Sequence, residues 1–237
     1  MRDDLVLIID TNSNYSDVWN PCFVRLNKFF PNIKKYVFTD SVEGIPSDFT
    51  PILYNNTHSY RNQLLSCLRQ VGEKYIIYTS EDYILYNLVD DVEIENISRT
   101  LDSTEYSFCK FIKGPENTSH YIGNLYEIDP KDPNFFAQQA SIWKTKDFTA
   151  IFEAAPPENT RMQHEPGGSK ICRQLGFKGL QHYSGTKKRG IHHHDSEIFP
   201  CIATAVVKGL WNISEYPAEM SEVIKEFNID VKIRGWR

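Results

Sequence analysis

The chain has 237 residues, of which 41% are hydrophobic and 24% are charged, and its formal net charge is −5. This balance excludes disordered and collagen-like chains. No apolar run approaches the roughly 20 residues that a membrane span needs. The acidic charge argues against a protein whose main task is to hold nucleic acid. The composition leaves a globular α/β or α+β enzyme or binding protein.

Five cysteines are scattered along the chain and none forms a CxxC pair. An odd, scattered set favours reduced thiols over a disulfide framework or a zinc site. The first apolar run, Leu5–Ile9, is too short for the core of a signal peptide, and no small-residue cleavage site follows it. We therefore expect a cytoplasmic protein without a transmembrane segment.

The first ninety residues alternate between apolar runs of strand length and helical patterns. Residues 5–9 and 75–79 form continuous apolar runs, which predict strands buried on both faces, and residues 36–39 predict another strand. Helical spacing fills residues 20–30 and 59–72, which Pro31 and Gly72 end. A strand, crossover helix, strand order implies parallel pairing.

The pattern of apolar and polar residues is less regular from residue 84 onward. In chain order it predicts a helix over 84–101, strands over 106–112, 125–128 and 140–143, a Pro- and Gly-rich loop over 155–168, a polar loop over 184–195, and a helix over 218–227. The whole pattern predicts an α/β fold with a mixed, mostly parallel central sheet flanked by helices. We expect one domain over 1–237, with a ligand-binding half over 1–90 and an irregular half over 91–237.

Polar side chains follow the predicted parallel strands, where ligands of open α/β sheets bind. They are Asp10, Thr11 and Asn12, then Asp40, then Glu81 and Asp82. Neither a GxGxxG nor a GxxxxGK[ST] phosphate loop is present. A diphosphate held at this edge therefore needs another counter-charge, usually a divalent cation.

Glu81 and Asp82 are the predicted ligands of that cation, because hard cations prefer carboxylate oxygens. The alternative is a helix start, with the two acids complementing the helix dipole. A run of three histidines, residues 192–194, supplies His192 and His194 as further ligands, although consecutive residues cannot all face one ion. The alternative for this run is a solvated loop.

Several cations could instead face a phosphate group. Lys187 and Arg189 lie in a basic run, and Lys208 follows later. Arg61 lies near the start of the second helix, where a helix N-terminus and a guanidinium together favour anions. A solvated loop and a surface salt bridge are the alternatives.

Two acids of the second half are possible general bases for a hydroxyl nucleophile. Glu165 lies in the predicted Gly/Pro loop, where backbone approaches substrates closely, whereas Glu153 falls on a short amphipathic helix and is expected to be structural. Trp143 is one of several aromatic residues whose ring could stack on a sugar, although most aromatic residues are core.

Together these features resemble a small glycosyltransferase of the GT-A type. The resemblance rests on residues 5–13 and 36–40, on Ser59-Tyr-Arg-Asn62 at a helix start, and on Tyr75 to Tyr83 in the place of the Asp-x-Asp strand. Residues 138–143, the His-Glu-Pro-Gly-Gly stretch at 164–168, and the late histidines resemble the acceptor side and the metal site. A true Asp-x-Asp is missing, since Glu81 and Asp82 are adjacent.

This resemblance implies a nucleotide-diphosphate sugar bound by Asp10, Thr11, Asn12, Asp40, Arg61 and Asn62, with Trp143, Lys187, Arg189 and Lys208 as further substrate contacts. It implies Mn²⁺ or Mg²⁺ on Asp82, with Glu81, His192 and His194 as partners, and Glu165 as the base. The acceptor would be a hydroxyl of a glycan or another molecule, and transfer would invert the anomeric centre, with retention left open. No nucleic acid is expected as a partner.

Two other functions stay open at this point. A nucleotidyltransferase uses a similar sheet, but usually carries a Gly-rich loop after its first strand, and residues 10–15 contain no glycine. A non-catalytic carbohydrate-binding protein of the same fold would explain the altered Asp-x-Asp.

Overall fold

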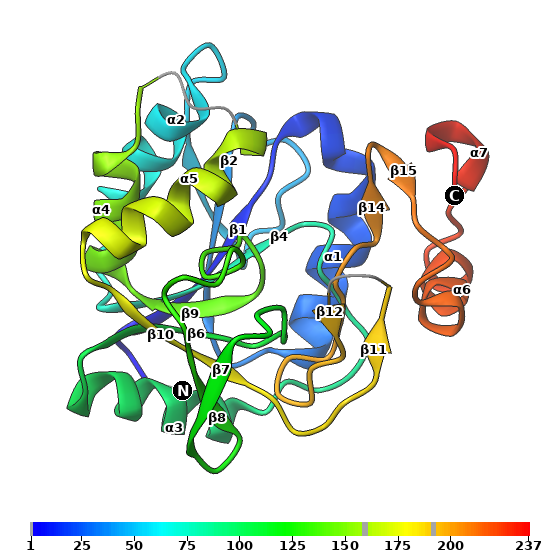
Figure 1. The fold of residues 1–237 in the computed structure, drawn as a ribbon. Coiled ribbons are helices and arrows are strands. Elements are labelled where there is room, and N and C mark those ends of the chain that lie inside the picture. The colour runs from blue at the N-terminus through cyan, green and yellow to red at the C-terminus, as the bar shows by residue number, and fades with distance from the viewer. Residues whose placement is uncertain (1, 158–160, 191–192) are drawn as a thin grey trace.

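The computed structural model describes residues 2–157, 161–190 and 193–237. Its centre is a nine-stranded sheet with the order β3-β2-β1-β4-β9-β6-β10-β8-β7 (Figure 1). The strands are β1 (Leu5–Asp10), β2 (Lys34–Thr39), β3 (Thr50–Leu53), β4 (Tyr75–Ser80), β6 (Tyr106–Lys110), β7 (Thr118–Ile122), β8 (Leu125–Ile128), β9 (Ser141–Lys144) and β10 (Lys178–His182). Strands β9 and β8 run opposite to the others. The predicted mixed, mostly parallel sheet is confirmed.

Strands β3, β2, β1 and β4 form the parallel part of the sheet. Every residue of β1 and β4 is buried, which explains their continuous apolar runs. The register sets Asp10 opposite both Phe38 and Ser80. The polar residues that end these strands therefore meet at one edge of the sheet.

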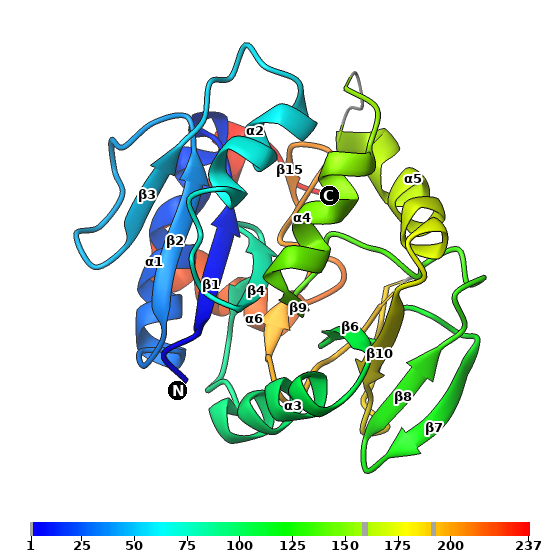
Figure 2. The ribbon, with the colours of Figure 1, turned by 90° about the vertical axis from the view of Figure 1, so that its left-hand side faces the viewer.

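Helices cover both faces of the sheet, and their apolar stripes form two separate cores (Figures 1 and 2). One face carries α1 (Ser16–Phe29), α3 (Asp91–Ser103) and α6 (Pro217–Glu226); the other carries α2 (Tyr60–Leu68), α4 (Thr145–Ala154) and α5 (Arg161–Gln174). None of the helices in the described ranges is both long and apolar enough to cross a membrane. All five cysteines are buried and unpaired.

Short pieces of regular structure complete the fold. They are the 3₁₀ helix η1 (Ser13–Tyr15) at the end of β1, the pairs β5 (Ile84–Leu85) with β13 (Cys201–Ile202), β11 (Lys188–Arg189) with β12 (His193–His194), and β14 (Val206–Val207) with β15 (Leu210–Trp211), and the helix α7 (Val231–Arg234). Of these, η1 and β5 lie in residues 1–90. The polar loop predicted over 184–195 thus carries the hairpin β11–β12.

Two predicted elements differ from the structure. The helix expected from Ile84 starts at Asp91, because the Asp90 carboxylate accepts the backbone N–H of Glu93 at 2.9 Å and caps the helix there. The loop expected over 155–168 gives way to α5 from Arg161. Gly168 is a packing residue of this helix, since a Cβ there would lie 2.4 Å from the Phe136 ring.

Candidate active site

The carboxylate of Asp10 ends strand β1 and is buried. Its Oδ2 atom accepts hydrogen bonds from the hydroxyl groups of Tyr78 at 2.6 Å and Tyr60 at 2.8 Å. Tyr78 comes from β4 and Tyr60 from the start of α2, so one carboxylate ties three elements together. Neutral donors orient a carboxylate without cancelling its charge.

Asn12 and Asp40 lie at the same edge and are only partly buried. The Asn12 side chain caps η1 through the N–H of Asn14 at 3.0 Å. Asp40 accepts the backbone N–H and the hydroxyl of Ser13 at 2.7 and 2.9 Å. Burial raises the pKa of Asp40, but these hydrogen bonds outweigh it and hold the pKa below its ordinary value.

Thr11 is a buried support for this edge. Its hydroxyl accepts the indole N–H of Trp19 at 2.8 Å, and its carbonyl accepts the Tyr54 hydroxyl at 2.8 Å. Asp10 and Thr11 therefore hold the edge from beneath, while Asn12 and Asp40 are the members that solvent reaches.

Glu81 and Asp82 follow β4 directly; Glu81 is buried and Asp82 half-buried. The predicted helix start is absent here, because the short strand β5 follows instead. The Asp82 carbonyl accepts the N–H of Ala205 at 3.2 Å, which joins this turn to the C-terminal segment. Burial raises the pKa of the Cys22 thiol on α1, and the charges of these two acids raise it further.

Glu165 projects from α5, and its Oε1 atom accepts the backbone N–H of Gln138 at 2.7 Å. The Gln138 side-chain amide in turn donates to the hydroxyl groups of Tyr60 and, at 3.4 Å, Tyr78. A continuous polar path therefore joins Asp10, at the end of β1, to Glu165 on α5.

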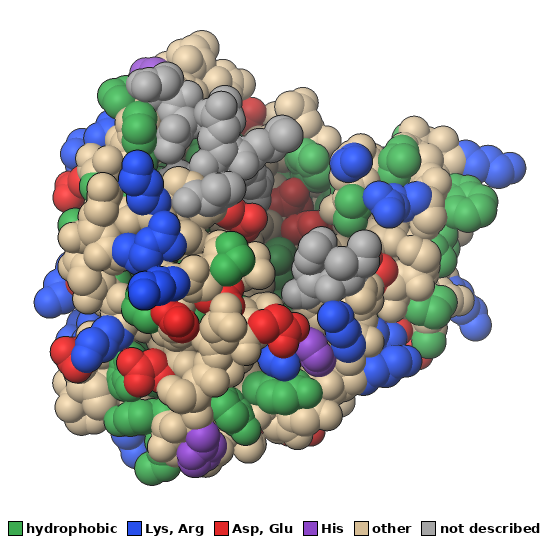
Figure 3. Space-filling view, viewed as in Figure 1, with side chains coloured by type: hydrophobic (Ala, Val, Ile, Leu, Met, Phe, Trp, Pro, Cys, Tyr) green, Lys and Arg blue, Asp and Glu red, His purple; other side chains and the backbone are tan. Residues whose placement is uncertain are grey.

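A pocket of about 400 Å³ opens between α5 and the C-terminal hairpins. Figure 3 shows this face hollowed, with acidic side chains in the depth of the hollow. The pocket is lined by Tyr83, Lys110, Ile112, Gly114, Asn134, Ala137, Gln139, Glu165, His193, Ala203 and Thr204. Asp82 precedes Tyr83 and bonds to the residue after Thr204, so it adjoins this pocket.

Lys110 is a buried residue of the pocket wall that sequence reasoning missed. It ends β6, is almost fully buried, and donates from Nζ to the carbonyl of Asn134. Burial lowers the pKa of Lys110 to about 8, against the opposing charges of Glu165 and Asp132. The only signal in the sequence was a lysine inside the apolar stretch from Tyr106 to Ile112.

The histidine run divides between two environments. His193 lines the pocket, lies 3.4 Å from the Glu215 carboxylate and stacks on Tyr216. His194 instead packs edge-on against Tyr183, and burial and Lys113 lower its pKa. His192 lies outside the described residues. The predicted ligand His194 thus points away, and His193 is the member that reaches the pocket.

A divalent cation needs several oxygen or nitrogen ligands around one point. No group of three or more His, Cys, Asp or Glu side chains suited to a metal occurs in the described ranges. Mg²⁺ in nucleotide enzymes, however, often uses one or two carboxylates and takes its remaining ligands from water and substrate phosphates. Glu81 and Asp82 can supply these carboxylates. Of the two predicted histidine ligands, His194 packs against Tyr183 instead, and His192 lies outside the described residues.

Arg61 and Asn62 serve a different purpose from the predicted phosphate contact. The Arg61 guanidinium donates to the carbonyls of Phe152 at 2.8 Å and Glu153 at 3.0 Å, and to Asn62 Oδ1 at 2.9 Å. These carbonyls end α4, so the guanidinium satisfies a helix C-terminus. The pair ties α2 to α4.

The later cations also lie away from the pocket. Arg189 pairs with Asp195 at 3.0 Å and Glu219 at 2.6 Å and packs on the Tyr216 ring, so its charge is already compensated. Lys187 lines a separate groove of about 340 Å³. Lys208 is exposed in the β14–β15 turn.

Trp143 is a core residue and not the substrate contact expected from the sequence. It is 1% exposed and stacks on Phe108 with ring centroids 4.1 Å apart. Its indole N–H donates to Ser141 at 3.0 Å. No face of the ring is left for a sugar.

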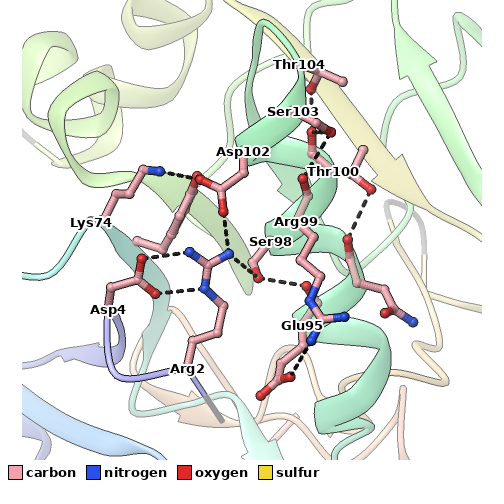
Figure 4. Close-up of polar contacts among 12 residues, drawn as sticks. Arg2, Asp4, Lys74, Glu95, Ser98, Arg99, Thr100, Asp102, Ser103 and Thr104 are labelled. Atoms are coloured by element: carbon pink, nitrogen blue, oxygen red, sulfur yellow. Dashed lines mark hydrogen bonds and ion pairs between the residues drawn. The ribbon is translucent and has the colours of Figure 1, made fainter.

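A larger cavity lies at the opposite end of the sheet. It measures about 710 Å³ and is lined by residues that include Lys74, Tyr75, Asp102, Lys144 and Glu153. Asp102 there accepts from Lys74, from Tyr75 at 2.6 Å and from Arg2 at 2.5 Å (Figure 4). The charge of Asp102 is thus balanced by Lys74 and Arg2, as in an ion cluster that stabilises the fold.

Solved structures place this architecture among known folds. The mannosyltransferase PcManGT from Pyrobaculum calidifontis, in complex with GDP-Man and Mn²⁺, is 13% identical over 80% of this chain and 59% of its own, with a TM-score of 0.51. The chain has a GT-A type fold. At such identity the likeness shows the fold alone.

Two other solved structures have lower TM-scores against this chain. The bifunctional IspDF from Campylobacter jejuni is 14% identical over 76% of this chain and 49% of that one, with a TM-score of 0.46. A CMP:2-keto-3-deoxy-manno-octonic acid synthetase complexed with CTP is 10% identical over 75% and 88%, with a TM-score of 0.48. The chain thus spans 59% of the mannosyltransferase and 49% of IspDF. No family model and no curated protein matches the sequence.

Proposed function

We propose that this chain is a glycosyltransferase that moves a sugar from a nucleotide-diphosphate donor to a hydroxyl group of a glycan or another acceptor. The observation that carries the proposal is the placement of Glu165. Its carboxylate lines the pocket, is held through one oxygen by the Gln138 N–H, and is joined through Gln138 to the strand ends where α/β sheets bind ligands.

The donor nucleoside is proposed to lie against Asn12 and Asp40, which are the partly exposed members of the β1 and β2 ends. The diphosphate would then extend toward Asp82, beside the pocket. A divalent cation, Mn²⁺ or Mg²⁺, bound by Asp82 and Glu81 together with the phosphates would neutralise the charge of the leaving group. Lys110 adds a protein cation on the pocket wall.

In the proposed reaction the acceptor hydroxyl attacks the anomeric carbon and the bond from that carbon to the diphosphate oxygen breaks. The second oxygen of Glu165, Oε2, takes the hydroxyl proton, while the electron pair of the broken bond leaves on the diphosphate. A single displacement of this kind inverts the anomeric centre. The five buried, unpaired cysteines support our further expectation of a cytoplasmic enzyme.

The test is thermal unfolding against UDP, GDP, dTDP and CMP and their sugars, with and without Mn²⁺, followed by turnover of each sugar that binds. A ligand at about 100 times its dissociation constant adds roughly 2.7 kcal/mol, which is a shift on the order of 5–10 °C for a chain of this size. We expect one nucleotide to give this shift and its sugar to release nucleoside diphosphate.

Other outcomes assign other functions. Pyrophosphate release from a nucleoside triphosphate and a sugar phosphate would make the chain a nucleotidyltransferase. Binding of glycans without turnover of any nucleotide sugar would make it a carbohydrate-binding protein. If no nucleotide shifts the unfolding temperature, the donor site proposed here is wrong.

A further inference from the structure

The corner of the molecule formed by β15, α7 and the residues after α7 exposes large apolar side chains. Ile233 is 85% exposed, Trp236 61% and Leu210 37%. Lys208, Lys232 and Arg237 surround them and are exposed as well. We call these six residues the C-terminal corner. In Figure 3, hydrophobic and basic side chains alternate over the region where Figure 1 places α7 and β15.

The backbone fixes this corner in place. The N–H of Trp211 donates to the Gly235 carbonyl at 3.0 Å, and the N–H of Arg237 donates to the Trp211 carbonyl at 2.9 Å. Leu210 touches Gly235 so closely that a Cβ there would lie 2.9 Å from its methyl carbon. The segment that carries Ile233 and Trp236 is thus bonded to β15, and its apolar side chains point outward from an ordered support.

The inner side of α7 is already used. Arg234 pairs with Asp17 at the start of α1 and lies 4.9 Å from the centre of the Tyr15 ring. Val231 packs against the main core. Since Arg234 and Val231 hold α7 to the molecule, Ile233 and Lys232 belong to its outer side.

The chemistry of the corner is specific. The chain as a whole carries a net charge of −5, yet three cations surround the apolar side chains here. Among the described residues, no ion pair joins Lys208, Lys232 or Arg237 to an acid. A tryptophan and an aliphatic side chain beside basic residues match the boundary between anionic headgroups and acyl chains.

We propose that the C-terminal corner docks the protein on an anionic membrane surface. Ile233, Trp236 and Leu210 enter the headgroup boundary, and the three cations lie against lipid phosphates. A nucleic acid would satisfy the cations but would leave the apolar side chains in water. A second copy related by a two-fold axis would bring like charges together across the contact.

The intrinsic fluorescence of the chain offers a direct readout. Three of its four tryptophans, Trp19, Trp143 and Trp211, are buried, and only Trp236 is exposed. On addition of phosphatidylcholine vesicles with about 30% phosphatidylglycerol, we expect a blue shift of the emission and protection of Trp236 from acrylamide. Pure phosphatidylcholine vesicles should give neither effect, and salt at about 0.5 M should reverse the binding.

Vesicle sedimentation with variants then tests the residues. The triple variant Lys208→Gln, Lys232→Gln, Arg237→Gln should bind on the order of a hundredfold more weakly, because each cation near an anionic surface contributes about fivefold. Ile233→Ser with Trp236→Ala should lose at least about tenfold. The matched control is Leu88→Ser with Val92→Ser, which removes side chains that are 65% and 67% exposed but stand beside Asp90 and Asp91.

We expect the control to bind like the wild type and all variants to keep the wild-type unfolding temperature. Equal binding to both vesicle types, or equal loss in the control, would overturn the proposal. Dimers detected by light scattering without vesicle binding would also overturn it and assign the corner to a second copy. None of these readouts depends on transferase activity.

Discussion

The two ends of strand β4 each place a tyrosine hydroxyl on an aspartate, but the two aspartates stand in different surroundings. At the amino end, Tyr75 donates to Asp102, which Lys74 and Arg2 also contact (Figure 4). At the carboxyl end, Tyr78 donates to Asp10, which also accepts from the Tyr60 hydroxyl. Among the contacts described here, the Asp102 carboxylate meets two cations and a hydroxyl group, and the Asp10 carboxylate meets two hydroxyl groups.

The site that we propose is not at the larger of the two cavities. The amino end has the larger cavity, about 710 Å³ against about 400 Å³. Its acidic and basic side chains form ion pairs with one another, as in an ion cluster that stabilises the fold. The carboxyl end instead gathers carboxylates around a pocket that Lys110 also lines.

The strongest test of the comparison is Glu165→Gln. The amide keeps an acceptor for the Gln138 N–H but cannot take a proton, so we expect kcat for donor turnover with acceptor to fall by about 10²–10⁴. The unfolding temperature should stay the same. The matched control is Glu153→Gln, which alters an exposed acid on α4 that lines the larger cavity. Equal activity in both variants would mean that the base lies elsewhere.

Gly168→Ala tests whether packing of α5 positions Glu165. The added methyl would meet the Phe136 ring at 2.4 Å, and Phe136 is buried. Overpacking of this kind costs about 1–3 kcal/mol, and we expect turnover to fall at least about tenfold as the helix shifts. Gly72→Ala is the control, because a Cβ added at this position would have no neighbour within 4 Å. Unchanged turnover in Gly168→Ala would show that α5 adjusts without moving the carboxylate.

The parallel half of the fold was predictable because its signals are local. Buried parallel strands need continuous apolar runs, and residues 5–9 and 75–79 are such runs. The carboxyl-end residues Asp10, Asp40 and Asp82 followed from the rule that strand ends carry ligands. Strands β3, β7 and β10 were missed. Strand β3 is short, and β7, Thr-Ser-His-Tyr-Ile, and β10, Lys-Gly-Leu-Gln-His, have little apolar pattern.

The second half was less predictable because its determinants are tertiary. Gly168 reads as a loop residue in sequence, whereas its contact with Phe136 makes it a helix-packing residue. Lys110 stands out only because it is buried near Glu165 on the pocket wall. His193 lines the pocket and His194 does not, because successive residues of a short strand point to opposite sides. None of these relations has a spacing that could be read along the chain.

A pair of tyrosine variants measures the two ends directly. Tyr78→Phe removes a donor from buried Asp10, and we expect about 2 kcal/mol of lost stability, since hydrogen bonds to charged groups are the stronger class. Tyr75→Phe should cost about 1 kcal/mol or less, because Asp102 keeps Lys74 and Arg2. Urea unfolding at constant pH compares them. Equal losses would show that the two carboxylates are equally dependent on neutral donors.

The last prediction is a pH dependence that Lys110 confers. Burial lowers its pKa to about 8 in the folded protein, whereas in the unfolded chain an ordinary lysine titrates near about 10.4. Between these values the unfolded state binds more protons, so the contribution of Lys110 to stability rises with pH. The folded protein meanwhile loses a cation from the pocket wall, and turnover should decline above pH about 8.

Lys110→Met should remove both trends, because methionine fills a similar volume without titrating. Lys144→Met is the control from the other end of the sheet, since Lys144 lines the larger cavity and burial lowers its pKa as well. We expect this control to alter the alkaline stability but to leave the pH profile of turnover as in the wild type. A turnover profile that shifts equally in both variants would mean that the decline follows overall charge and that the cation facing Glu165 has no separate role.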